Sequence, residues 1–335
     1  MQKFVVNVEY VGYRIDKYLI EQKINMLYSR SMIEKLLLSE NILVNSKLCK
    51  RKSHKLKYGD TIDIIRESVD LQRENYPQKE NIELNIVYED EYLAIINKPA
   101  GLIVHPCPNN DRGTIVNALL FHFDSLSIND LKRPGIVHRL DKDTTGLLIV
   151  TKDNNTHSKM SQLFMQRKVE KYYLCVVLGV PNPLNGTIDL PIGRHKTQRM
   201  KMAICEDGKR AISHYRTLID FEFYSFLEVK IETGRTHQIR VHLNAINTPI
   251  VGDAVYSTNQ RIFEKCPFYK QNDLKKYIKN NDFNLMLHAT RLKFVHPFTN
   301  DYLDVSVGPP DSINIFLDFL KSSFEYCYIN QNNNQ

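Results

Sequence analysis

Residues 135–151 read GIVHRLDKDTTGLLIVT and place a charged segment between two runs that favour extended structure. The runs at 136–140 and 147–151 predict strands on either side of it. A strand that ends in several charged residues and then resumes brings those side chains together at a sheet edge or in a cleft. Two interpretations of Asp141 follow from these residues alone: it caps a tight turn, or it reacts with a ligand.

Strands and helices alternate irregularly around this segment. Further strands are predicted at 86–88, 92–96, 102–105, 172–178, 226–232 and 302–307. Apolar residues recur at helical spacing within 160–164 and within 315–320, which predicts a helix at each place. Because strands and helices mix without a regular β-α-β order, the sequence predicts an α+β fold with a mixed, mainly antiparallel sheet.

The first part of the chain has a pattern of its own. Ile15, Tyr18 and Leu19 recur at helical spacing, a second helical pattern begins at Ser31, and residues 61–65 favour a strand. These features predict a small module of two helices followed by a β element. The expected division is a module at 1–70, a linker at 71–82, the main domain at 83–325 and a flexible tail at 326–335. Residues 259–283 show no clear pattern and are expected to form a peripheral loop.

Composition excludes several classes of protein. The chain has 335 residues, of which 42% are hydrophobic and 25% charged, as in a globular protein of about two domains. No apolar run approaches the roughly 20 residues of a membrane helix, and the first residues show no targeting signal. We therefore expect a cytoplasmic protein without a membrane partner. The cysteines lie far apart, without a C-x-x-C pair, which argues against a zinc site and a disulfide framework.

Positive charge is concentrated in two places. The net charge is +7, and residues 47–57 carry six Lys and Arg without an acidic residue. A second basic cluster lies at 194–201. Each cluster alone is typical of a solvated surface, but two clusters in different modules favour a nucleic acid as the partner.

Residues 234–242 read GRTHQIRVH and form the second candidate segment. They follow a predicted strand and begin a predicted helix, so their backbone N–H groups and two arginines would suit a phosphate or a carboxylate. A well-capped surface helix is the alternative interpretation. The sequence contains no G-x-G-x-x-G, Walker or H-E-x-x-H motif, which argues against dinucleotide, phosphate-loop and zinc-peptidase chemistry.

Four groups of residues, in this order, resemble the motifs of the RluA/RluD family of pseudouridine synthases. They are 97–101 (NKPAG) with 104–106 (VHP), 135–147, 234–242, and 287–289 (LHA) with 296–297 (HP). The first module resembles an S4 RNA-binding domain in 14–19 (RIDKYL), 29–31 (SRS), 44–45 (VN) and 59–60 (GD). The S4-like module and the stretch 194–202 are most similar to the RluD branch of the family, which modifies large-subunit ribosomal RNA.

The resemblance implies a reaction and the residues that perform it. Uracil is detached from its ribose at N1 and rejoined through C5, without a metal or an organic cofactor. Asp141 is the implied catalytic carboxylate and Arg240 the arginine that keeps it charged, with Arg235 as the alternative. Tyr173 is the implied active-site tyrosine, which stacks on the base and moves a proton. Tyr172 faces the other way if this segment is a strand.

Further residues are implied in RNA binding. A uridine inside folded RNA must be flipped out to react, and Arg139 is the candidate that fills the gap. His138 and Arg235 are expected to contact the substrate as well. The expected phosphate contacts of the S4-like module are Arg30, Lys35, Lys50, Arg51 and Lys52. Three further histidines of the motifs are expected to hold the fold through hydrogen bonds: His105, His237 and His288.

Other functions stay open at this point. The same reaction could act on tRNA or messenger RNA, or the chain could be an RNA-binding ribosome-assembly factor without catalytic activity. A metal-dependent RNA hydrolase would use Asp141 and Asp143 to hold Mg²⁺. The hypothesis carried forward is a uridine isomerase that acts as a monomer on large-subunit ribosomal RNA or the assembling large subunit.

Overall fold

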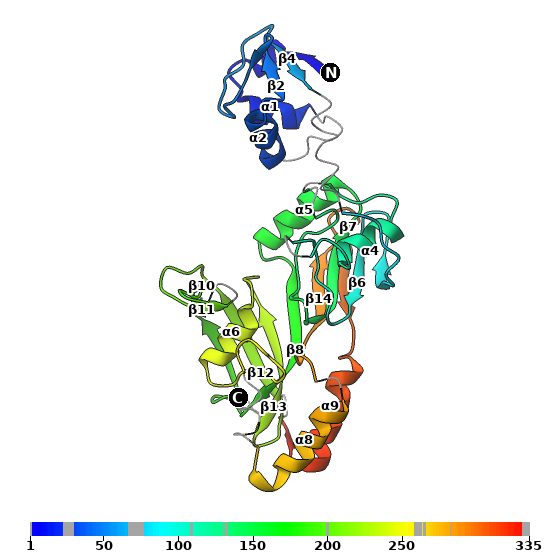
Figure 1. Cartoon of the computed structure of the whole chain (residues 1–335), viewed down its shortest axis with the longest axis vertical. Coiled ribbons are helices and arrows are strands. Elements are labelled where there is room, and N and C mark those ends of the chain that lie inside the picture. The colour runs from blue at the N-terminus through cyan, green and yellow to red at the C-terminus, as the bar shows by residue number, and fades with distance from the viewer. Residues whose placement is uncertain are drawn as a thin grey trace. The chain divides into compact units, whose positions relative to one another are not determined.

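The computed structural model describes residues 2–22, 30–65, 77–107, 110–128, 130, 133–198, 201–257, 263, 266–281 and 283–329. Backbone contacts divide the chain into two compact units, whose elements Figure 1 labels. The first consists of Met1–Glu83, His105–Ile136 and Thr151–Ser158, and the second of Leu84–Val104, Val137–Val150 and Lys159–Gln335. Two segments of the predicted main domain therefore group with the first unit, which no local sequence pattern reveals.

The first unit begins with the module of helices and strands that the sequence predicts. Helices α1 (Ile15–Glu21) and α2 (Arg30–Leu38) precede β2 (Ile42–Val44), β3 (Lys47–Leu48) and β4 (Thr61–Ile64). An unpredicted strand, β1 (Gln2–Val5), completes the antiparallel order β1-β4-β2-β3. Apolar side chains of both helices and of the sheet share one core, so the predicted helix–helix–β order is confirmed. The 3-10 helix η1 (Val8–Tyr10) and α4 (Ile115–His122) also belong to this unit.

A mixed sheet is the centre of the second unit. Its strand order is β16-β12-β13-β8-β14-β7-β6-β5, with β15 paired to β14 and β9 paired to β12. Strand β8 runs antiparallel to β13 and β14, whereas β14 and β7 are parallel. The strands are β5 (Asn85–Glu89), β6 (Leu93–Lys98), β7 (Thr145–Thr151), β8 (Glu170–Leu178), β9 (Asn185–Asp189), β12 (Ile212–Asp220), β13 (Tyr224–Ile231), β14 (Leu287–Val295), β15 (Tyr302–Ser306) and β16 (Cys327–Tyr328). The predicted α+β fold with a mixed, mainly antiparallel sheet is confirmed.

The remaining elements are helices and a small separate sheet. They are α5 (Asn154–Met165), α6 (Gln238–Ala245), η3 (Phe268–Lys270), α8 (Gln271–Asn280), α9 (Asp311–Ser323), and the pair β10 (Ile192–Arg194) and β11 (Met202–Ile204). Within the described ranges, no helix is both long and apolar enough to cross a membrane.

Strand β7 follows the charged segment and is buried along its whole length. Leu147 packs in a core with Leu292 of β14. At the start of the strand, Gly146 has a φ of +108° and pairs with Ala289 of β14. A Cβ on this residue would collide with the backbone of Ala289, so only glycine fits. This close approach fixes where β7 begins and the charged loop ends.

Two of the predicted strands are loops. Residues 102–105 and 136–140 contain bends and isolated bridges but no strand. The backbone oxygen of Leu102 accepts from the Lys98 side chain at 3.0 Å rather than from a neighbouring strand. Val104 and Leu140 are nevertheless buried. The apolar runs therefore reflect burial of the loops and not extended pairing.

The last part of the chain is more regular than its pattern predicts. Within 259–283, expected to be a peripheral loop, α8 buries Leu274 and Tyr277. The Tyr277 ring stacks on Phe319 of α9, with 4.8 Å between the ring centroids. In the predicted flexible tail, β16 pairs with the end of β12. Both elements are held by residues that are distant in the sequence, which explains why local patterns miss them.

Gly146→Ala is expected to lower the free energy of unfolding by about 2–4 kcal/mol, because the added Cβ overlaps the backbone of Ala289 and the positive φ is strained. Gly308→Ala is the control, since a Cβ there meets nothing within 4 Å. Chemical denaturation of both variants measures the difference. Equal stability of the two variants would contradict the packing at the start of β7.

Candidate active site

Asp141 lies in the loop before β7, and a buried lysine fixes this loop. Lys98, at the end of β6, is fully buried. Its Nζ donates to the backbone oxygens of Pro99, Leu102 and Lys142 at 2.8, 3.0 and 2.8 Å. Burial lowers the pKa of Lys98 to about 8, although two nearby carboxylates counteract this effect. The ammonium therefore ties the end of β6 to the turn that carries Asp141.

Helix α6 brings an arginine to Asp141. His237, just before the helix, has a left-handed φ of 57°, and the helix begins at the next residue. Arg240 Nη1 donates to Asp141 Oδ2 at 3.0 Å. Nε and Nη2 of the same guanidinium donate to Oδ2 and Oδ1 of Asp253, both at 2.8 Å. One arginine thus binds two carboxylates from different parts of the chain.

Asp253 is also fixed in position, by backbone hydrogen bonds and by burial. Its Oδ1 accepts from the backbone N–H groups of Val255 and Tyr256 at 2.9 and 3.1 Å, and the residue is 1% exposed. Burial would raise the pKa of Asp253, but Arg240 and these N–H groups outweigh burial and hold the pKa below its usual range. Burial would likewise lower the pKa of Arg240, but Asp253 and Asp141 raise it. Asp253 and Arg240 are therefore both charged at neutral pH.

Tyr173 and His237 border the same carboxylate. Tyr173, on β8, is buried, and burial and the charge of Asp141 both raise its pKa, so its hydroxyl is protonated at neutral pH. His237 Nε2 lies 3.9 Å from Asp141 Oδ2, and its Nδ1 lies 2.8 Å from the Tyr256 hydroxyl. Burial lowers the pKa of His237 even though Asp141 pulls it upward. A neutral imidazole and a neutral phenol thus face the Asp141 carboxylate.

These side chains surround a small pocket. The pocket has a volume of about 80 Å³. Its charged and polar lining includes Arg139, Asp141, Thr144, Tyr173, Arg235, His237, Gln238 and Arg240. The structure therefore brings together the three residues expected to be catalytic, although they come from a loop, a strand and a helix. Arg139 and Arg235 are the exposed charged members of the lining.

The other motif histidines have partners inside the fold. His138 Nε2 accepts from the backbone N–H of Ile149 at 2.9 Å, and burial and a nearby lysine lower its pKa to about 3. The neutral His138 ring therefore braces the charged loop against β7. His288 Nδ1 lies 2.8 Å from the Thr145 hydroxyl, and His105 Nδ1 lies 3.1 Å from the backbone oxygen of the next residue. The internal hydrogen bonds expected of the histidines are present.

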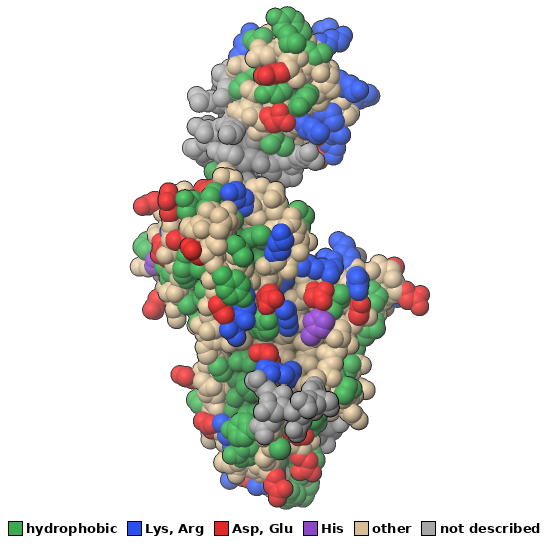
Figure 2. Space-filling model, turned by 180° about the vertical axis from the view of Figure 1, so that it is seen from behind, with side chains coloured by type: hydrophobic (Ala, Val, Ile, Leu, Met, Phe, Trp, Pro, Cys, Tyr) green, Lys and Arg blue, Asp and Glu red, His purple; other side chains and the backbone are tan. Residues whose placement is uncertain are grey.

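Basic side chains of the N-terminal module line a separate pocket. Its volume is about 540 Å³. Its basic lining residues are Lys47, Lys50, Arg51, His54, Lys55 and Lys57. Figure 2 shows Lys and Arg side chains gathered on one side of this module. Such a surface suits a polyanion.

Three of the five predicted phosphate contacts of this module can be placed. Lys50 and Lys52 form exposed ion pairs with glutamates at 2.5 and 2.6 Å. Arg51 is exposed and forms no ion pair within the described part of the chain. The side chains of Arg30 and Lys35 lie outside the described residues.

Asp253 and Tyr256 take part in the site although no sequence motif contains them. Lys98 does so from within the 97–101 motif, where no role was expected of it. Lys98 follows an apolar strand directly, and a lysine in that position is the signal that could have identified a buried cation. Asp253 and Tyr256 have no comparable signal, because their partners Arg240 and Met202 lie 13 and 54 residues away. Among the described residues, no group of three His, Cys, Asp or Glu side chains could hold a metal ion.

Asp253→Asn is expected to lower the free energy of unfolding by about 3–5 kcal/mol, because it leaves the buried Arg240 without its main counter-charge. Asp304→Asn is the control. It removes a partly exposed pair with Arg291 and should cost less than about 1 kcal/mol. Urea denaturation at neutral pH measures both values.

The contribution of Asp253 also depends on pH. Its folded pKa lies below the unfolded value of about 3.9, so the stabilisation is complete above that pH and is lost as the pH falls through the folded pKa. Wild type should therefore lose more stability than Asp253→Asn between pH 6 and pH 2. Equal acid sensitivity of the two proteins would contradict the ion pair.

Comparisons with known proteins point to one family. Residues 92–245 match the family model described as RNA pseudouridylate synthase. The chain is 36% identical over 320 residues to "Ribosomal large subunit pseudouridine synthase D" of Escherichia coli (strain K12), covering 96% of this chain and 94% of that protein. It is 38% identical over 311 residues to the protein of that name from Buchnera aphidicola subsp. Schizaphis graminum (strain Sg), covering 92% and 95%.

A solved structure gives the same result. "Human RNA Pseudouridylate Synthase Domain Containing 1" is 25% identical, covers 76% of this chain and 93% of its own, and has a TM-score of 0.55. The curated relatives match nearly the whole chain at more than a third identity. The chain therefore belongs to the RNA pseudouridine synthase family.

Proposed function

We propose that this protein converts uridine to pseudouridine in large-subunit ribosomal RNA, with Asp141 as the reacting carboxylate. The observation that carries the proposal is the Asp141 carboxylate, held at 3.0 Å by Arg240 in a pocket that Tyr173 also lines. Relatives that match nearly the whole chain are named as synthases of the large ribosomal subunit, which supports this class of RNA as the substrate.

Asp141 reacts through one oxygen of its own carboxylate. The reaction breaks the bond from uracil N1 to ribose C1′ and forms a bond from C5 to the same carbon, with loss of the C5 proton. An ionised carboxylate serves each chemical route: addition to the sugar, addition to C6 of the base, or removal of a ribose proton to give a glycal. Arg240 and His237 both approach Oδ2. Oδ1 is hydrogen-bonded to none of the described residues and is the oxygen left for the reaction.

Tyr173 supplies a protonated phenol and an aromatic face. Its hydroxyl keeps its proton at neutral pH, because burial and the Asp141 charge raise its pKa. It therefore can donate a proton while the base is detached and accept one when C5 loses its hydrogen. Flipped bases commonly stack on aromatic rings, and the Tyr173 ring lines the pocket.

The two exposed arginines of the pocket bind the RNA around the target. Flipping a nucleotide out costs a few kcal/mol for unstacking and unpairing. Arg139, two residues before Asp141, fills the position that the uridine leaves. Arg235 Nε donates to the Arg210 backbone oxygen at 3.2 Å, which leaves its terminal nitrogens for the substrate. His138 contributes by bracing the loop that carries Arg139.

The N-terminal module gives salt-dependent affinity for RNA. Arg51, Lys50 and Lys52 pair with phosphates, and the two lysines exchange their glutamate partners for RNA when it binds. The protein acts as a monomer in the cytoplasm, on large-subunit RNA or on the assembling subunit. The reaction uses neither a metal nor an organic cofactor.

Asp141→Asn is expected to reduce turnover by at least about 10³-fold, since it removes the reacting oxygen, while leaving the RNA affinity within about threefold of wild type. The assay incubates the protein and EDTA with large-subunit ribosomal RNA transcripts labelled with tritium at uracil C5, and counts released tritium. Forming the C5 bond releases that hydrogen, whereas binding or strand cleavage does not. Asp143→Asn, an exposed change in the same loop, is the control and should release tritium as wild type does.

Each other outcome assigns a different function. Tritium release by Asp141→Asn at the wild-type rate would contradict its role, and a parallel loss of RNA binding would make Asp141 a structural residue. Release from tRNA transcripts alone would change the substrate class. Binding without release from any RNA would identify a non-catalytic assembly factor, and Mg²⁺-dependent strand cleavage would identify a hydrolase.

A further inference from the structure

A larger groove adjoins the small pocket around Asp141. Its volume is about 480 Å³. The groove and the pocket share the lining residues Arg139, Tyr173, Ile231, Gly234 and Arg235. The groove extends from these residues to Lys171 of β8, to Arg167, and to the last turn of α5. A molecule whose reacting part occupies the pocket therefore continues into this groove.

Lys171 is a buried cation without a counter-charge in the part of the chain that the structure describes. It precedes Tyr173 by two residues on β8, so both side chains lie on the same face of the strand. The residue is 7% exposed. Its ammonium lies 5.7 Å from the centre of the Phe164 ring and makes no hydrogen bond or ion pair with any described residue. A buried charge of this kind is costly unless a ligand supplies the opposite charge.

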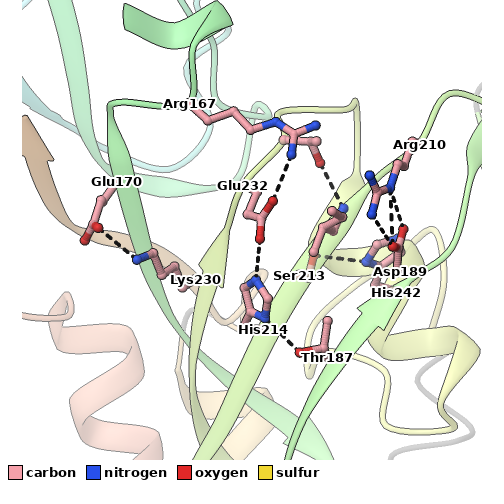
Figure 3. A network of polar contacts seen from close by, with 12 residues as sticks. Arg167, Glu170, Thr187, Asp189, Arg210, Ser213, His214, Lys230, Glu232 and His242 are labelled. Atoms are coloured by element: carbon pink, nitrogen blue, oxygen red, sulfur yellow. Dashed lines mark hydrogen bonds and ion pairs between the residues drawn. The ribbon is translucent and has the colours of Figure 1, made fainter.

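The neighbouring carboxylates already have partners, as Figure 3 shows. Glu232 pairs with Arg167 at 2.9 Å and with His214 at 2.9 Å. Glu170 pairs with Lys230 at 2.9 Å. The side chains that line the groove include four Lys and Arg against the single carboxylate of Glu232. The groove therefore has an excess of positive charge, which an anionic ligand would balance.

The causes of the lowered pKa of Lys171 also fit a binding site for an anion. Burial and, to a smaller extent, the charge of Arg167 lower its pKa to about 8. No acidic group acts in the opposite direction, in contrast to Lys98, where two carboxylates do. At neutral pH most Lys171 side chains still carry the charge, and a bound anion would stabilise it.

Part of the groove lining is apolar. Phe164 and Met165 end α5, and Met165 is 78% exposed. An apolar surface beside a buried cation and two exposed arginines fits a base together with its phosphate better than an inorganic anion. We propose that this groove binds a nucleotide adjacent to the target uridine, with its phosphate on the Lys171 ammonium and its base against Phe164 and Met165. The proposal rests on the proposed function, since the pocket must hold the target.

The first test measures RNA affinity without relying on catalysis. Filter binding of a large-subunit ribosomal RNA transcript is carried out at several salt concentrations. Lys171→Met should raise the Kd about tenfold and reduce the slope of log K against log salt by about 0.7–0.9, the contribution of one phosphate. The matched control is Lys230→Met, which removes the same charge from the neighbouring strand outside the groove and should change neither value.

A second variant covers the case in which Lys171→Met fails to fold. Met165→Glu changes an exposed side chain and adds a negative charge to the groove, so it should also raise the Kd about tenfold. Unchanged Kd and salt slope in a folded Lys171→Met, or unchanged Kd in Met165→Glu, would overturn the proposal. These results stand whether or not tritium is released, so failure of this proposal is separable from failure of the proposed function.

The second test locates the phosphate. In a hairpin that carries the modified uridine, each phosphate within two nucleotides of it is replaced in turn by a neutral methylphosphonate. One replacement should weaken RNA binding by wild type about tenfold and leave RNA binding by Lys171→Met unchanged. At saturating unmodified RNA, the kcat of Lys171→Met should lie within about twofold of the wild-type kcat. If every replacement weakens both proteins equally, or if kcat falls while KM is unchanged, the Lys171 phosphate site does not exist.

Discussion

Arg240 is the residue on which the rest of the site depends. Its guanidinium binds Asp253 through two nitrogens and Asp141 through the third, so the position of the reacting carboxylate follows from a rigid fork. Asp253 follows Gly252, whose φ of +76° and close approach to a neighbouring backbone leave no room for a side chain. Lys98 fixes the same loop at Lys142, the residue after Asp141. The end of β6, the loop before β7 and the start of α6 thus meet at the Asp141 carboxylate.

The charges of the pocket and of the groove differ, and the difference matches the substrate. Around the reacting carboxylate, the charges of Asp141 and Asp253 are balanced by Arg240 and by the buried Lys98, so an uncharged uracil can approach without disturbing this balance. Arg139 and Arg235 line both the pocket and the groove. The groove beside the pocket has positive charge in excess, led by Lys171. A flipped nucleotide has the same division, with a neutral base on an anionic backbone. The two cavities together thus suit one nucleotide in the pocket and its neighbour outside.

The fold class could be predicted because it is encoded in local patterns, whereas the roles of the principal site residues were expected from the resemblance of their motifs to those of a known family. The period-2 pattern of β8 places Tyr173 inward and Tyr172 outward, and the structure agrees: Tyr173 lines the pocket, whereas the Tyr172 hydroxyl donates to Glu170. The pairing of Asp141 with Arg240, 99 residues apart, was expected from family resemblance and not from spacing.

What could not be predicted depends on contacts between distant segments. Asp253 acts through an arginine on another element, and Lys171 is distinctive only because no carboxylate of the described residues pairs with it, which a sequence does not reveal. The apolar runs at 102–105 and 136–140 are buried as loops, because hydrogen bonds that involve side chains replace the ladder of a neighbouring strand. Burial and strand pairing produce the same apolar pattern, and only the folded chain separates them.

Arg240→Lys tests the central claim most directly. A lysine keeps the positive charge but lacks the fork that spans Asp253 and Asp141, so the carboxylate should lose its fixed position. Single-turnover tritium release from saturating large-subunit RNA should fall about 100-fold, with the RNA affinity unchanged. Release within about twofold of wild type by a folded Arg240→Lys would show that charge alone suffices and that the bridging geometry of Arg240 does not position Asp141.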